Sequence, residues 1–200
     1  MKSSHSLNIL TLPTLLPVSL VEMKEYLRIV HTQHDNLVND LILSAVDQLR
    51  EDTNFVPSLT TFQYKQDNVD DPYNHAWDSD IVIYLNNVNE ITTFTYINTD
   101  GETITMEEGT DYEADLEYPV RIKLLNSIEV EEGYKKIQVT LTAGYNNADN
   151  IPAIVKQGIK YLVAHYYENP TPAVSGTMVS TVPDTYTRLI NLPIFKRVRV

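Results

Sequence analysis

One long helical pattern near the C-terminal end constrains this chain more than any other feature. Within residues 150–169 the apolar side chains recur at the spacing of a single helix face, at Ile151, Ile154, Val155, Ile159, Leu162, Val163 and Tyr166. Pro152 stands where the first turn of a helix tolerates proline. The pattern predicts a closing helix with one buried face, and we expect that face to pack on a sheet.

Two further helices are predicted near the N-terminal end. Ser19 and Glu22 have the spacing of a capping box, which predicts a helix over residues 20–28. A second helix is predicted over residues 36–52, with His34 or Asp35 in the capping position. Its apolar stripe consists of Leu37, Val38, Leu41, Ile42, Ala45, Val46 and Leu49. The two helices should form an antiparallel pair or an angled corner.

The segment between these helices and the closing helix follows the period of two that is typical of strands. Strands are predicted over residues 60–64, 81–85, 91–98, 102–106, 111–114, 120–124 and 137–142. Asp100 and Gly101 supply the positive backbone angles that a tight hairpin needs. The fold class is therefore α+β, with an N-terminal helix pair, an antiparallel β-sheet or meander, and a closing C-terminal helix.

The two ends of the chain are less clearly patterned. Residues 1–16 are predicted to be an extended N-terminal arm, covered in part by its own domain or by a neighbouring subunit. Residues 17–169 form the predicted main domain, and residues 170–200 a C-terminal tail that contains several prolines. Within the tail, residues 184–192 predict a short helix, and residues 194–200 alternate like a strand.

Charge and composition narrow the functional classes. The chain has 15 basic and 27 acidic residues, a formal charge of −12, so nonspecific attraction to a phosphate backbone is not expected. It has no cysteine, which excludes thiol chemistry and thiolate metal sites. No run of residues approaches the apolar length that spans a bilayer, so we expect a soluble protein with no membrane partner.

The sequence shows no pattern of residues for catalysis, a metal or a cofactor. His31 and His34 are expected to be solvated or capping histidines, and His165 a packing histidine, because no further ligand or nucleophile accompanies them. The carboxylates within residues 107–117 lack the spacing of a calcium loop and fit a solvated face. We expect no cofactor and no enzyme activity.

Thirteen tyrosines stand against a single tryptophan. Several of them gather around the closing helix and the tail, namely Tyr145, Tyr161, Tyr166, Tyr167 and Tyr186. Tyrosine is favoured at protein interfaces, but it also fills cores, and the sequence leaves both interpretations open. The candidates for a subunit interface are Tyr161, Tyr166 and Tyr167.

Several short stretches, through their order and spacing, resemble one known family. They are residues 17–28 (PVSLVEMKEYLR), 95–101 (TYINTDG), 111–112 (DY), 139–145 (VTLTAGY), 151–154 (IPAI) and 162–169 (LVAHYYEN). Together, over residues 17–169, they are similar to the head-to-tail connector (adaptor) proteins of tailed bacteriophages. The leading arm, the loop of residues 65–79 and the tail beyond residue 169 depart from the family pattern.

The resemblance implies a structural virion protein without catalytic residues. Such a protein would bind the portal protein and form a ring, of about twelve copies in this family, that extends the DNA channel. It would offer a platform to a neck or tail-completion protein, and DNA would pass without sequence-specific binding. The expected location is the virion neck, between the capsid portal and the tail, with host cytoplasm as the site of assembly.

We further expect the tail to dock onto the portal, because its last residues combine apolar and basic side chains in an acidic protein. The candidate docking residues are Phe195, Lys196, Arg197, Val198, Arg199 and Val200. The alternative is a tail that packs back on its own domain. For the whole chain, the alternatives are another neck or tail-completion protein, or a carbohydrate-binding module or hydrolase that uses Trp77, the tyrosines and the carboxylates.

Overall fold

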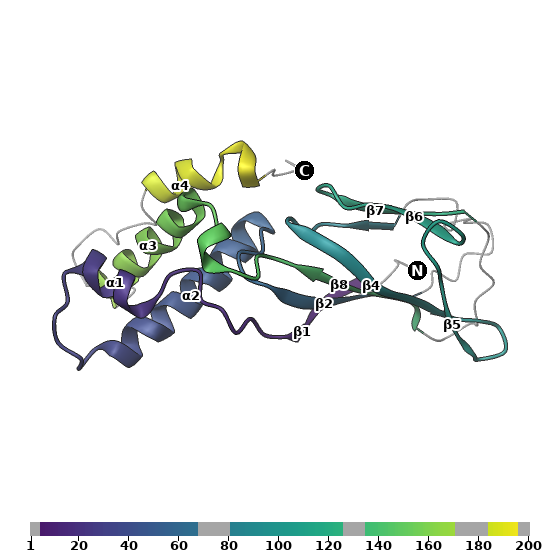
Figure 1. The fold of residues 1–200 in the computed structure, drawn as a ribbon, viewed down its shortest axis with the longest axis horizontal. Helices are drawn as coiled ribbons and strands as arrows, with labels where there is room; N and C mark the ends of the chain where they lie inside the picture. The colour runs from purple at the N-terminus through teal and green to yellow at the C-terminus, as the bar shows by residue number, and fades with distance from the viewer. Residues whose placement is uncertain (1–4, 68–80, 126–134, 171–183, 196–200) are drawn as a thin grey trace, which may run out of the picture. The chain divides into compact units, whose positions relative to one another are not determined.

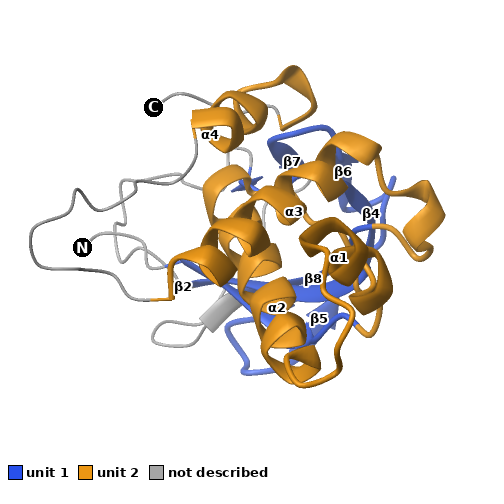
Figure 2. Ribbon diagram, turned by 90° about the vertical axis from the view of Figure 1, so that its left-hand side faces the viewer, with its two compact units in different colours: residues 1–13, 59–144 blue, residues 14–58, 145–200 orange. Residues whose placement is uncertain are grey.

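The computed structural model describes residues 5–67, 81–125, 135–170 and 184–195, which divide between two compact units (Figures 1 and 2). Residues 1–13 and 59–144 belong to the first, which carries the strands and is called the sheet unit here. Residues 14–58 and 145–200 belong to the second, the helical unit, which carries the α-helices. Helices combined with antiparallel sheets confirm the predicted α+β class.

The sheet unit contains two antiparallel sheets (Figure 1). The first has the strand order β1-β2-β8-β4-β5, with β1 at His5–Thr11, β2 at Thr60–Asp67, β8 at Lys135–Ala143, β4 at Val88–Ile97 and β5 at Thr103–Thr105. The second has the order β3-β7-β6, with β3 at Ile81–Ile83, β7 at Val120–Leu124 and β6 at Tyr112–Asp115. Each strand predicted between residues 60 and 142 is present, with ends that differ by a few residues.

The strand order differs from that of a simple meander. Strand β8, the last in the sequence, lies between β2 and β4, where Val139 is opposite Tyr64 on one side and Phe94 on the other. All three side chains are buried. Local turn chemistry predicts hairpins but carries no information on such long-range pairings, which depend on burial of the shared face.

The predicted hairpin at residues 99–101 is confirmed. Strands β4 and β5 pair across it, Gly101 has a φ of 79°, and the side chain of Asn98 accepts hydrogen bonds from the backbone N–H groups of Asp100 and Glu102. The two sheets meet through Phe94 of β4 and Tyr112 of β6, whose ring centroids are 5.0 Å apart. The sheet unit therefore has a core of its own.

The N-terminal arm forms a strand that the sequence pattern did not predict. Strand β1 pairs with β2 in antiparallel register from His5 opposite Gln66 to Ile9 opposite Phe62. The register then shifts, so that Leu10 has no opposite residue in β2. This part of the arm is therefore covered along one edge by β2 of the same chain, one of the two kinds of cover that were expected.

The helical unit contains α1 at Leu20–Leu27, α2 at Asp35–Thr53, α3 at Ala153–Glu168 and α4 at Asp184–Ile190, with short 3₁₀ turns η2 at Ala148–Asn150 and η3 at Pro193–Phe195. The four predicted helices are confirmed. Pro152, expected inside the first turn of α3, is the residue that precedes it. None of the helices in the described residues has the length and hydropathy needed to cross a membrane.

The closing helix α3 buries its apolar face among other helices. Val155, Ile159 and Leu162 are fully buried in one cluster with residues of α1, α2 and α4, which we call the helical core. The expectation that this face packs on the sheet is therefore corrected. An apolar stripe at helical spacing is equally suited to a sheet or to another helix, so periodicity alone could not choose the partner.

The described C-terminal segment, residues 184–195, belongs to the helical core as well. Its buried side chains are Tyr186, Leu189, Ile190 and Phe195. Residues 193–195 form a 3₁₀ turn, so the strand predicted from residue 194 is wrong at its start. Residues 196–200 and Trp77 lie outside the described residues.

Candidate interaction surfaces

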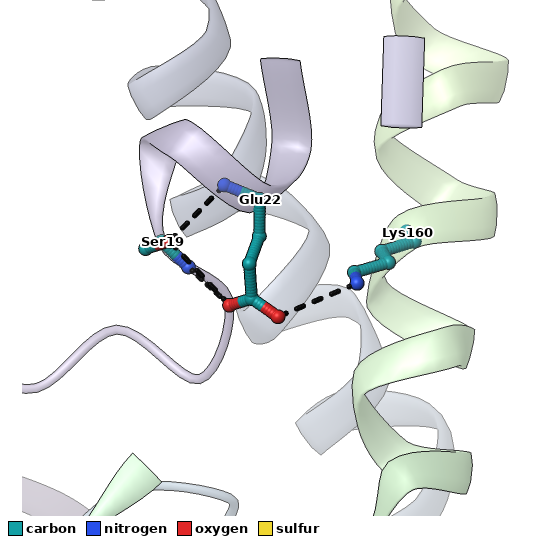
Figure 3. A network of polar contacts seen from close by, with 3 residues as sticks. All are labelled: Ser19, Glu22 and Lys160. Carbon is teal, nitrogen blue, oxygen red and sulfur yellow. Dashed lines mark hydrogen bonds and ion pairs between the residues drawn. The ribbon is translucent and has the colours of Figure 1, made fainter. Parts of the chain in front are cut away.

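A polar network ties the first helix to α3 (Figure 3). Ser19 Oγ accepts a hydrogen bond from the backbone N–H of Glu22, and the Glu22 carboxylate accepts one from the backbone N–H of Ser19, which confirms the predicted capping box. The other carboxylate oxygen of Glu22 lies 3.5 Å from Nζ of Lys160 in α3. Burial raises the pKa of Glu22, but the Ser19 backbone together with Lys160 and Lys156 outweighs it, and the net pKa is lowered.

The end of α3 is held to the start of α2 by Tyr167. Its hydroxyl and Nδ1 of His34 share a hydrogen bond of 2.6 Å. His34 is the residue at the N-cap position of α2, yet its side chain makes no capping hydrogen bond. Asp35 forms an ion pair of 2.6 Å with Lys24 of α1 instead. The predicted capping role of these side chains is therefore replaced by contacts with α3 and α1.

The other two tyrosines proposed as a subunit interface, Tyr161 and Tyr166, are also half-buried against the helical core. Burial raises the pKa of Tyr166, and the nearby carboxylate of Asp52 raises it further. All three tyrosines thus use part of their surface within their own helical unit and keep part of it exposed. Their contact with a neighbouring subunit stays a prediction.

Phe195 does not have the exposure on which its predicted portal contact depended. Its side chain is fully buried, and its ring meets that of Phe55 edge-on, with centroids 5.5 Å apart. In the same segment, the hydroxyl of Tyr186 donates a hydrogen bond of 2.8 Å to Asp52 of α2. Phe195 is therefore an anchor in the helical core, and only residues 196–200 remain as candidates for docking.

Exposed apolar side chains mark two surfaces, one in the loop between α1 and α2 and one in the N-terminal arm. Val30, in the loop between α1 and α2, is 96% exposed. In the N-terminal segment Leu10 is 53% and Leu12 is 73% exposed. The second group lies in the arm that was expected to be covered by its own domain or by a neighbouring subunit, and no residue from 3 to 21 is charged.

The acidic stretch at residues 107–117 has a structural role in turns. Asp111 accepts a hydrogen bond from the backbone N–H of Glu107, and Asp115 accepts one from that of Glu117. Most of these carboxylates are exposed, as predicted for a solvated face. In the part of the chain that the structure describes, no group of His, Asp and Glu side chains could hold a metal ion.

Three solved structures with a similar fold come from GTA particles. A chain in a structure titled "Neck of empty GTA particle computed with C6 symmetry" has a TM-score of 0.76 and 18% identity, covering 98% of this chain and 97% of that one. A chain from the "Neck of native GTA particle computed with C12 symmetry" has a TM-score of 0.72 at 18% identity and the same coverage. At such identities the similarity shows a shared fold.

A further chain, from the "Virion of native gene transfer agent (GTA) particle", has a TM-score of 0.75 and 16% identity, covering 97% of this chain and 96% of that one. No match was found among curated protein sequences. A family model, described as phage gp6-like head-tail connector protein, matches residues 17–118, just over half of the chain. The chain therefore belongs to the phage gp6-like head-tail connector family.

Proposed function

We propose that this chain is a non-enzymatic structural protein in the neck of a tailed phage or phage-like particle. It binds the portal protein, forms a ring that extends the DNA channel, and provides the platform for the next neck or tail protein. The match of residues 17–118 to the connector family is the observation that carries this proposal. The fold shared with chains of GTA necks and virions supports it over nearly the whole length.

The ring is supported by the assemblies in which the similar folds occur. One of those necks was computed with C12 symmetry and another with C6 symmetry, which fits a ring of about twelve copies. A head-to-tail ring needs two different complementary patches on each subunit. Tyr161, Tyr166 and Tyr167, each half-buried at the surface of α3, are candidates for one side of that contact.

The charge of the chain suits a conduit for DNA. Twelve copies with a formal charge of −12 each carry a formal charge of −144. A negatively charged wall repels the phosphate backbone, so DNA can pass without being held. We therefore expect no sequence-specific contact between the ring and DNA. The host cytoplasm is the proposed site of assembly.

Portal docking is assigned to residues 196–200, which include Lys196, Arg197 and Arg199. Phe195, the residue before them, is itself buried in the helical core and is therefore no longer a docking candidate. Removing residues 185–200 would delete Tyr186, Leu189, Ile190 and Phe195 from the core and would confuse folding with docking. The informative truncation ends at Phe195.

The test combines full-length chain and truncated chain with the portal protein of the same particle. Full-length chain should co-sediment with portal and appear in electron micrographs as a ring below it. The chain truncated after Phe195 should keep its thermal unfolding midpoint and lose portal binding. A full-length chain that never associates with portal would contradict the proposed function, and unchanged binding by the truncated chain would remove only the docking role.

A further inference from the structure

Strand β1 ends the five-stranded sheet on one side. It pairs with β2 along one edge, and in the described part of the chain no strand pairs with its other edge. An edge strand presents unpaired backbone N–H and C=O groups and is a template for pairing with another chain. Proteins usually protect such edges with charged side chains or proline.

This edge lacks the protection by charge. β1 contains no Asp, Glu, Lys or Arg, and neither does any position from residue 3 to residue 21. Three leucines in and just after β1 are exposed: Leu7 at 39%, Leu10 at 53% and Leu12 at 73%. We call these three residues the leucine edge. The register shift after Ile9 leaves Leu10 without an opposite residue in β2, so only the part before it, His5–Ile9, offers a regular ladder.

We propose that the leucine edge is where the neighbouring copy of this chain docks in the ring. This inference rests on the proposed function, since it requires that copies lie side by side. Two chains of charge −12 repel one another, so their contact is most stable where neither presents carboxylates. The leucine edge presents no carboxylate. Covering it also removes exposed apolar surface from water, which stabilises the contact.

The complementary edge on the neighbouring copy is strand β5. It ends the same sheet on the opposite side, and its residues Thr103, Ile104 and Thr105 are uncharged. Pairing of β1 from one copy with β5 from the next joins two unlike edges, which is the head-to-tail arrangement that a ring requires. Pairing of β1 with β1 would instead give a closed dimer.

A charge-insertion experiment tests the leucine edge. The variant L10K/L12K places two lysines on exposed positions, and the control L43K places one on α2, where Leu43 is 48% exposed. Mass measurement with and without the portal protein should show rings for wild type and L43K, and monomers for L10K/L12K. Circular dichroism and thermal unfolding should show that all three chains are folded.

Other outcomes of the charge-insertion experiment would contradict the contact between neighbouring copies. Rings of L10K/L12K that bind portal normally, or equal loss of rings in L43K, would overturn the assigned contact and leave the proposed function intact. Rings of L10K/L12K that no longer bind portal would assign the edge to the portal instead. A wild-type chain that stays monomeric both alone and with portal would overturn the ring and this contact together.

A cross-linking experiment does not depend on how the lysine variants fold. The natural chain has no cysteine, so introduced cysteines are the only reactive thiols. The variant N8C/T105C, treated with a short bifunctional maleimide, should give a ladder of covalent oligomers, whereas N8C/S44C should give no ladder. Dimers from N8C alone would show β1–β1 pairing, and a ladder absent from N8C/T105C despite ring formation would overturn the pairing with β5.

Discussion

The ring of Phe195 packs edge-on against that of Phe55, with centroids 5.5 Å apart, and both side chains are buried in the helical core. Phe55 follows the end of α2, whereas Phe195 follows α4 near the C-terminus. The contact therefore ties the last described segment of the chain to the helix pair at its beginning. Phe195, which was expected to dock onto the portal, is instead an integral part of the fold.

Replacing Phe195 by alanine should strongly destabilise the helical unit. Truncation of a buried phenylalanine typically costs about 3–5 kcal/mol of unfolding free energy, through lost burial and the cavity that remains. The control F195L keeps most of the volume and should cost much less. Denaturant-induced unfolding followed by circular dichroism measures both, and an F195A midpoint equal to that of wild type would show that Phe195 is not held in the core.

The hydrogen bond from Tyr186 to Asp52 should contribute measurably to the attachment of α4. Y186F keeps the buried ring and removes only the donor to the carboxylate, 2.8 Å away. Loss of a hydrogen bond to a charged group should cost about 1.5–3 kcal/mol. Amide hydrogen exchange in Y186F should then be faster than in wild type, and this increase should be larger in α4 than in α2. Equal exchange in wild type and Y186F would contradict a role of this bond in holding the segment.

The capping box at Ser19 and Glu22 should make a pH-dependent contribution to stability. S19A should cost about 1 kcal/mol, as for other lost N-caps. The lowered pKa of Glu22 means that its carboxylate stabilises the fold above the ordinary glutamate pKa, and that this contribution is lost as pH falls through the lowered value.

The pH dependence can be measured by comparing wild type with the variant E22Q. The difference in unfolding midpoint between wild type and E22Q should be largest near neutral pH and should shrink in acid. E25Q is the matched control, since Glu25 is exposed on the same helix, and it should show a smaller difference. A wild-type advantage over E22Q that grows in acid would reverse the expected sign.

Gly158 allows close approach between α3 and α4. A Cβ atom added at this position would lie 3.0 Å from Cδ2 of Leu189. Alanine is favoured over glycine in a helix by about 1 kcal/mol, which opposes this crowding. A double-mutant cycle separates the two effects, because G158A should be more favourable in the L189A background than in wild type. Equal effects in both backgrounds would show that the two positions do not interact.

Much of the local structure could be predicted because it depends on neighbouring residues. The capping box of Ser19 and Glu22, the stripe of α2 and the Asp100-Gly101 hairpin each follow from spacing within a few positions. Strand β1 could not be predicted in this way, because its pairing with β2 joins residues far apart in the chain.

The candidate surfaces likewise combine features that a local pattern predicts with features that depend on long-range packing. The tyrosines of α3 could be identified from composition, but the hydrogen bond between Tyr167 and His34 depends on how α2 and α3 pack. Phe195 was expected to dock onto the portal because apolar and basic side chains are combined at the end of an acidic chain, whereas its burial beside Phe55 depends on residues far away in the sequence. A local pattern carries no information about such a long-range contact.

The sequence by itself determined the order of helices and strands, the α+β class and the resemblance to connector proteins, because these depend on local periodicity and short motifs. Only the tertiary structure decided that β8 lies at the centre of its sheet, that α3 packs among helices, and that Phe195 is buried while the leucine edge stays exposed. The physical reason is that burial is a property of the assembled fold, and one apolar residue can satisfy it against many different partners.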